Sequence, residues 1–176
     1  GGVDGDELLA MTRPFVFRKY VDYTAFEAMR EMKAMIEREV ARRNIEDDIK
    51  LGAGGIREVE FIVQVFQLIY GGSKLELQDR QCLVSLKHLG EVGLLDDEAV
   101  VDLEDAYLFL RRVEHAIQAL NDQQTQSLPS EIDPRNRIVE TLGFEDWDQF
   151  ITHLNQKQQK VIYQFEHLIK EKGTET

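Results

Sequence analysis

The stretch of this sequence best suited to chemistry is a glycine-rich loop that carries two cations, KLGAGGIR at residues 50–57. Glycines ahead of a helix let backbone amides approach a ligand, and a helix N-terminus adds partial positive charge. Phosphate is the ligand that such a loop suits best. The candidate contacts are Lys50, Gly52, Gly54, Gly55 and Arg57.

The alternative is that these glycines only supply permissive dihedral angles for a tight turn. The glycine pattern taken alone favours this alternative, because it matches neither the Rossmann nor the P-loop spacing. The residues that follow the loop, in contrast, favour a functional site.

Polar side chains form one stripe on the helix that follows the loop. Arg57, Glu60 and Gln64 recur at helical spacing, although apolar residues extend nearly all the way round this helix. Such a helix is expected to be central, and its buried polar groups need partners. A later helix offers a matching face, formed by Arg111, Arg112, Glu114, His115 and Gln118.

We expect the two polar faces to meet in a charge network that orders the mouth of the glycine loop. The alternative is a solvated face, or a buried salt-bridge cluster that only fixes the register of the helices. The expected members of the network are Glu58, Glu60, Gln64, Arg111, Arg112 and Glu114.

Other catalytic chemistries find little support in the sequence. Glu114 and His115 are adjacent, so they do not form the Glu-x-x-His pair of a di-metal bundle, and we predict no metal site. His115 is better interpreted as a structural hydrogen-bonding residue than as a phosphate acceptor. No nucleophile elbow, zinc ligand set or serine triad is present, and the Gly72-Ser73 pair is interpreted as coincidental.

The elements that must position the loop are all helices in this prediction. The three prolines and most of the glycines fall at segment ends, and the apolar residues follow helical periodicity. We predict an antiparallel bundle of about five to six main helices, with the glycine-rich loop before a central helix. The expected helices start near Asp22 or Thr24 and run to Arg43, then cover residues 56–70, 79–92, 96–121, 134–143 and a last segment capped by Asp146.

The composition fits one globular domain and argues against nucleic acid as a partner. Apolar residues make up 43% of the 176, and the formal net charge of -12 is the wrong sign for nonspecific nucleic-acid binding. A single cysteine, Cys82, falls in an apolar helical pattern, which indicates a buried thiol in a reducing compartment. No apolar stretch is long enough to cross a membrane, and we expect a cytoplasmic protein.

Four blocks of the sequence are more specific than any of these patterns. They are RPFVFRKY at 13–20, DIKLGAGGIREVEFIVQ at 48–64 continuing to Gly71-Gly72, LRRVEH at 110–115 and NDQQTQSLP at 121–129. In this order, the blocks closely resemble bacterial glutamine synthetase adenylyltransferase. The form of the second block is similar to the adenylyl-removing half of that family.

The resemblance implies an enzyme with two similar halves, one of which attaches AMP to a tyrosine of glutamine synthetase while the other removes it by phosphorolysis. In each half, a nucleotidyltransferase domain precedes a helical domain. Residues 1–21 would be the end of the first domain and residues 22–176 the second. The family's catalytic carboxylates have no counterpart here, so we expect no catalytic residue and no activity from these residues alone.

The same resemblance implies Mg and ATP or ADP for the parent enzyme, with none bound by this part of it. It also implies partners: glutamine synthetase, a PII-type signal protein and the adjoining nucleotidyltransferase domain. The glycine loop would then lie against the nucleotidyltransferase cleft. A second hypothesis is a regulatory docking module that binds glutamine synthetase or a PII-type protein without touching nucleotide.

Overall fold

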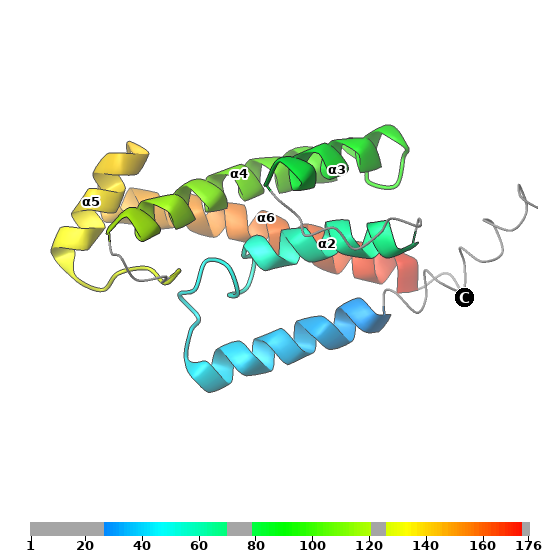
Figure 1. The fold of residues 1–176 in the computed structure, drawn as a ribbon, viewed down its shortest axis with the longest axis horizontal. Coiled ribbons are helices and arrows are strands. Elements are labelled where there is room, and N and C mark those ends of the chain that lie inside the picture. The colour runs from blue at the N-terminus through cyan, green and yellow to red at the C-terminus, as the bar shows by residue number, and fades with distance from the viewer. Residues whose placement is uncertain (1–26, 70–78, 121–125, 174–176) are drawn as a thin grey trace, which may run out of the picture.

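The structure is a computed structural model that describes residues 27–69, 79–120 and 126–173, in which every regular element is a helix (Figure 1). The first of them covers residues 27–43. The others are α2 (Ile56–Ile69), α3 (Asp79–Glu91), α4 (Asp97–Leu120), α5 (Ile132–Leu142) and α6 (Trp147–Gly173). The predicted all-α fold is confirmed.

The ends of the helices follow the capping residues in the sequence. Asp96 Oδ1 accepts the N–H of Ala99 at 2.7 Å at the start of α4, and Asp146 Oδ1 accepts that of Gln149 at 2.7 Å at the start of α6. Gly143 ends α5 in the left-handed conformation, with φ of 79°. These local signals explain why the predicted starts of α4 and α6 agree with the structure to within one residue.

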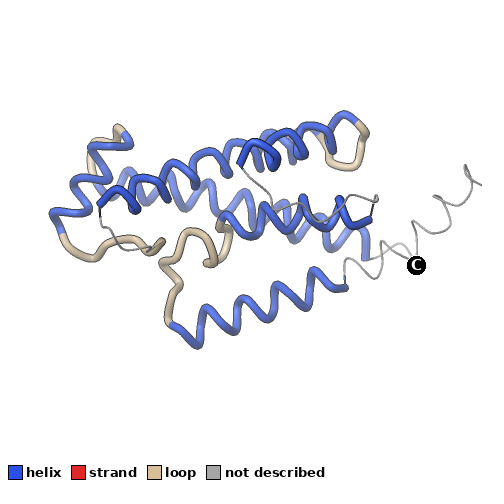
Figure 2. The backbone as a smooth tube through the Cα atoms, in the orientation of Figure 1, coloured by secondary structure: helices blue, strands red, loops and turns tan. Residues whose placement is uncertain are grey.

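Helix α4 lies at the centre of the bundle and packs against α2, α3, α5 and α6. Asp105 contacts Lys157 whereas Asp102 contacts Lys160, so residue numbers fall along α4 as they rise along α6. The two longest helices are therefore antiparallel, and they run side by side in Figures 1 and 2. The fully buried side chains between the helices include Phe66, Leu86, Leu103, Tyr107, Leu110, Phe150 and Phe165.

Two expectations about helices need correction. Helix α5 begins at Ile132, two residues before Pro134, because the missing N–H of proline costs nothing in the first helical turn. In the first helix, the helical spacing of Met29, Met32, Ile36 and Val40 predicts one buried apolar face. Met32 is nevertheless 43% exposed, so that helix buries a narrower face than its periodicity indicates. The proposed caps Asp22 and Thr24 lie outside the described residues.

Two other features bear on how the chain is used. The Cys82 side chain is buried, as its position in an apolar pattern predicts. Among the described residues, no helix is both long enough and apolar enough to span a membrane.

The core of α4 gives the first testable prediction. Leu103→Ala should lower the free energy of unfolding by about 2–5 kcal/mol, because Leu103 is 1% exposed and its loss leaves a cavity. Leu108→Ala, on the same helix but 50% exposed, should cost less than about 1 kcal/mol. Urea denaturation of both variants would measure the difference, and equal losses would contradict the assigned orientation of α4.

Candidate functional site

The first half of the glycine-rich loop is organised by one carboxylate. Asp48 Oδ1 accepts the backbone N–H groups of Lys50 and Leu51, each at 2.9 Å. The carbonyl of Asp48 accepts the N–H of Gly52 at 2.8 Å. Aspartate stabilises turns in this way, and here it closes the chain into a compact bend before the glycines.

The second half of the loop closes onto the first turn of α2. Ile56 N–H donates to the carbonyl of Ile49 at 3.1 Å, and Arg57 N–H donates to that of Lys50 at 3.0 Å. Gly55 N–H donates to the carbonyl of Gly52 at 3.0 Å. The first amides of a helix are usually open to a cap or a ligand, but here the loop itself provides the acceptors. An anion at this loop would therefore meet side chains rather than these amides.

The glycines are required by the close approach of backbone. A Cβ atom on Gly54 would lie 2.4 Å from the carbonyl oxygen of Gln158 in α6, and the residue has φ of +70°. Added Cβ atoms on Gly52 and Gly55 would lie 2.5 and 2.7 Å from the carbonyl oxygens of Asp48 and Ile49. Each of these distances is too short for a side chain, so steric demands alone account for glycine at all three positions.

The segment that precedes α5, residues 126–131, lies beside the loop and is joined to it by backbone hydrogen bonds (Figure 1). Ile49 N–H donates to the carbonyl of Gln126 at 3.0 Å, and Leu128 N–H donates to that of Asp47 at 3.2 Å. These bonds flank a single antiparallel bridge between Asp48 and Ser127. The apolar residues Ile49 and Leu51 suggest a brief extended stretch in the sequence, whereas the structure has one bridged pair, Asp48 with Ser127, just before it.

The polar faces of α2 and α4 lie together beside this loop. Glu60 on α2 is buried within electrostatic reach of Lys50, Arg57, Arg111 and Glu114. Arg57 Nη1 lies 3.6 Å from Glu60 Oε2, and Arg111 Nη1 lies 2.6 Å from Glu114 Oε2. We call Lys50, Arg57, Glu60, Arg111 and Glu114 the loop charge cluster. It contains three cations and two carboxylates.

Burial dominates the acid–base behaviour of this cluster. Desolvation raises the pKa of the Glu60 carboxyl above 4.5, and the nearby cations Arg57, Lys50 and Arg111 oppose that shift. Because Arg57 and Lys50 are only partly buried, solvent weakens their attraction for the carboxylate. The free energy that is lost by desolvating the Glu60 carboxylate is therefore only partly offset by its attraction to the cations of the cluster.

Glu58 does not belong to the loop charge cluster. Its Oε2 accepts the N–H of Gly54 at 3.2 Å, and its surroundings include Lys33, Glu37 and Glu166 instead. Residues two apart on a helix point in nearly opposite directions, which separates Glu58 from Glu60. Desolvation raises the pKa of the Glu58 carboxyl, and Lys33 partly opposes this shift.

The remaining predicted residues lie at the margin of the cluster. Gln64 is partly buried on α2, whereas Arg112 and His115 are exposed on α4. The structure thus brings Arg57, Glu60, Arg111 and Glu114 together and places Glu58 elsewhere. Within the described ranges, no three His, Cys, Asp or Glu side chains are grouped so that they could hold a metal ion.

Two residues that organise the site were not singled out from the sequence. Asp48 closes the loop, and Gln126 contacts both parts of the site: its carbonyl accepts from Ile49, and its Nε2 donates to Glu114 Oε1 at 3.4 Å. Aspartate commonly accepts hydrogen bonds from the backbone amides of a turn that follows it, so the role of Asp48 could have been recognised from the sequence. Nothing in the local pattern around Gln126 indicates these partners, because Glu114 lies 12 residues away in the sequence and Ile49 much farther.

Comparison with known proteins identifies the chain. Residues 30–169 match the family described as GlnD PII-uridylyltransferase. The chain belongs to this family. It is also 75% identical, over 99% of its length, to the bifunctional glutamine synthetase adenylyltransferase/adenylyl-removing enzyme of Acinetobacter baylyi (strain ATCC 33305 / BD413 / ADP1).

This GlnD-family chain covers 19% of the length of that relative. The matched residues include the glycine-rich loop, the loop charge cluster and all five helices α2 to α6 up to residue 169. The resemblance to glutamine synthetase adenylyltransferase inferred from the four sequence blocks is confirmed.

The close approach at Gly54 gives a prediction with a matched control. Gly54→Ala and Gly93→Ala both place alanine at a positive φ, of +70° and +76°, which costs about 1–2 kcal/mol. Only the Cβ on Gly54 also meets α6, whereas that on Gly93 meets nothing within 4 Å. We expect Gly54→Ala to lower the unfolding free energy by about 1–3 kcal/mol more than Gly93→Ala does. Equal losses in thermal or urea unfolding would contradict the contact between the loop and α6.

Burial of Glu60 predicts a pH-dependent contribution to stability. Because its folded-state pKa is raised above 4.5, the folded chain holds this proton more tightly than the unfolded chain does. The unfolding free energy therefore falls as pH rises from about 4.5 through the raised pKa. Glu60→Gln should remove this fall, so the stability of the variant relative to wild type should increase across that window. Urea denaturation at a series of pH values tests this, and a constant difference would refute it.

Proposed function

We propose that the chain is the helical part of a nucleotidyltransferase that controls glutamine synthetase by removing AMP from one of its tyrosines. The other half of the parent enzyme would add the AMP. The observation that carries this proposal is the 75% identity over 99% of the chain to a relative named for both activities. The isolated chain would be inactive, because the catalytic carboxylates would belong to the adjoining nucleotidyltransferase domain.

The contribution of this domain would be made through side chains at the glycine loop. The amides of Gly54, Gly55 and Arg57 already have acceptors within the chain, whereas the Arg57 side chain is 38% exposed. Lys50 lies on the same loop and is also partly accessible. With Arg111 behind them, the loop charge cluster has one more cation than carboxylates and favours an anion at its open side. Glycine would then shape the loop while Lys50 and Arg57 contact phosphate.

A phosphate contact also agrees with the names of the similar proteins. The family is described as a uridylyltransferase, whereas the relative is named an adenylyltransferase. A domain found in both would serve a feature that uridylyl and adenylyl groups share, and that feature is the phosphate. The described residues accordingly need not distinguish one base from the other.

In phosphorolysis, inorganic phosphate attacks the phosphorus of the protein-bound AMP, and the tyrosine oxygen leaves. Charge accumulates on the phosphate oxygens, so positioning and electrostatic stabilisation make up most of the catalysis. Arg57 and Lys50 would orient the phosphate and offset its charge, while Glu60, whose Oε2 lies 3.6 Å from Arg57 Nη1, holds the guanidinium in place. Magnesium would supply further charge neutralisation when bound, and the described residues offer no group of ligands for it.

The alternative proposal is a docking module for glutamine synthetase or a PII-type protein, with no nucleotide contact. The outward face of α4 favours it, because Val101 and Leu108 lie seven residues apart on that face and are 61% and 50% exposed. Asp105 lies between them and is also exposed. Docking through such a face would weaken with ionic strength and would be insensitive to substitutions at Arg57.

The proposed role of Arg57 predicts a kinetic defect in the full-length enzyme that carries this domain. Arg57→Ala should slow phosphorolysis of adenylylated glutamine synthetase by about tenfold to a hundredfold, because one charge-assisted contact to phosphate is lost. Rates at varied phosphate concentration would show where the loss falls, and thermal unfolding would establish that the variant is folded.

The control is Arg137→Ala, which removes an exposed arginine from α5 and should leave the rate unchanged. Phosphorolysis that stays undiminished in Arg57→Ala would rule out the phosphate contact. If the same enzyme instead lost binding of glutamine synthetase on Leu108→Ala, the docking alternative would be favoured.

A further inference from the structure

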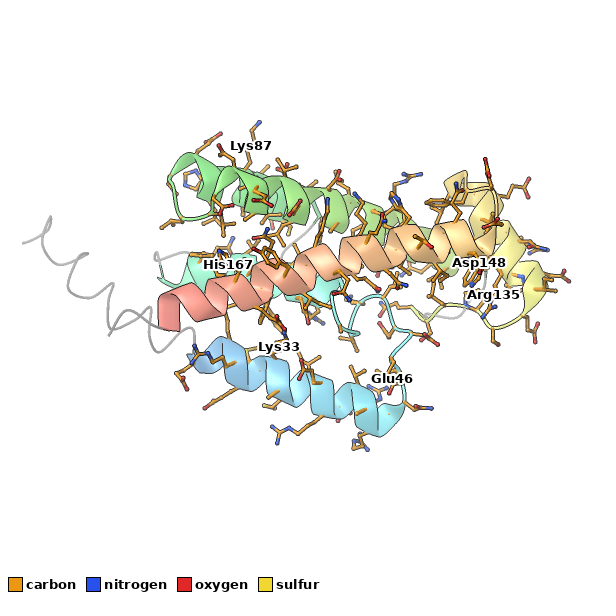
Figure 3. All side chains as sticks on the ribbon, turned by 180° about the vertical axis from the view of Figure 1, so that it is seen from behind. Lys33, Glu46, Lys87, Arg135, Asp148 and His167 are labelled. Atoms are coloured by element: carbon orange, nitrogen blue, oxygen red, sulfur yellow. The ribbon has the colours of Figure 1, made fainter. Side chains whose placement is uncertain are left out.

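A cavity of about 320 Å³ separates the first helix, residues 27–43, from the rest of the bundle. Its walls come from that helix, from the loop over residues 46–53, from α2 and from α6. Figure 3 shows Lys33 between the first helix and α6, and Glu46 just beyond the end of that helix. The volume lies at the lower limit for small-molecule sites, which indicates a small ligand.

The interior of this cavity is mainly apolar. Phe61 of α2 and Ile162 and Phe165 of α6 line one side, while Ile36 and Val40 of the first helix line the other. The first helix thus meets the bundle through its ends more than through its middle, with Met29 buried at one end and Val40 at the other. A hydrocarbon chain placed here would be covered by apolar side chains on both sides.

Carboxylates outnumber cations around the cavity. Glu37, Glu46 and Glu58 line it, and Lys33 is the cation among its lining residues. Lys33 is already engaged, since its Nζ lies 4.0 Å from Glu37 Oε1 and 4.8 Å from the centre of the Phe165 ring. An anion would therefore be repelled, whereas a cation would be attracted.

Glu58 is the group that points to a particular ligand chemistry. The residue is 7% exposed, and one of its oxygens accepts the N–H of Gly54. In the described part of the chain, its other oxygen has no hydrogen-bond donor, and no ion pair joins it to Lys33. This oxygen of a largely buried carboxylate lies at the wall of the cavity and is available to a ligand, and a cationic donor forms the strongest hydrogen bond with it.

We propose that this cavity binds a small aliphatic amine, with its ammonium group on Glu58 and its hydrocarbon chain against Phe61, Ile162 and Phe165. The chain supplies the two features that such a ligand requires, a carboxylate at one wall and an apolar interior. The site lies on the face of α2 opposite the loop charge cluster, so this proposal is independent of the proposed function. Occupancy would fix the first helix against α2 and α6.

The test is a titration of the 176-residue chain with 1-aminopentane, followed by amide chemical shifts. We expect saturable shifts at residues that line the cavity, with 1-pentanol binding at least about tenfold more weakly because it lacks the charge. Glu58→Gln retains a carbonyl oxygen for the Gly54 amide and should weaken the amine at least about tenfold. Glu46→Gln, farther along the loop, should weaken it in the same direction.

The control is Glu39→Gln, which removes the same charge from an exposed position of the first helix and should leave binding unchanged. Absence of saturable shifts with the amine would overturn the proposal. Equal affinity for the amine and 1-pentanol would also overturn it, as would unchanged binding in folded Glu58→Gln. If that variant does not fold, unchanged binding in Glu46→Gln decides against the site.

Discussion

The structure depends on one constraint: the buried amides at the start of α2 must find acceptors, and the glycine-rich loop provides them. The carbonyls of Ile49 and Lys50 accept from the first turn of α2, so the loop folds back over the helix that it precedes. This fold brings Gly54 against the backbone of α6 at Gln158. The loop is thereby fixed to α2 and α6 at once, and Gln126 fixes it to the segment before α5.

A rigid loop gives the two sides of α2 different environments. Glu58 and Glu60 are both buried, but they point to opposite sides of the helix. Glu60 lies among cations of the loop and α4, whereas Glu58 reaches Gly54 and faces the cavity below the first helix. The two faces of this short helix therefore differ in charge, with cations prevailing around Glu60 and carboxylates around Glu58.

The sequence predicts what depends on local pattern. The periodicity around Leu103 and Tyr107, the cap at Asp146, and the polar faces of α2 and α4 all follow from the local sequence of one helix. It does not predict the acceptors of the loop amides, because those depend on the three-dimensional path of the carbonyls. For the same reason, the glycine spacing alone could not separate an open amide cradle from a closed loop, and Gln126 received no role.

The most direct test of this account is hydrogen exchange at the amides of the loop in the 176-residue chain. The amides of Gly54, Ile56 and Arg57 have acceptors, whereas that of Ala53 has none among the described residues. The account predicts slow exchange at the first three positions and fast exchange at Ala53. Exchange as fast at Gly54, Ile56 and Arg57 as at Ala53 would contradict it, because the amides would then be open to receive an anion.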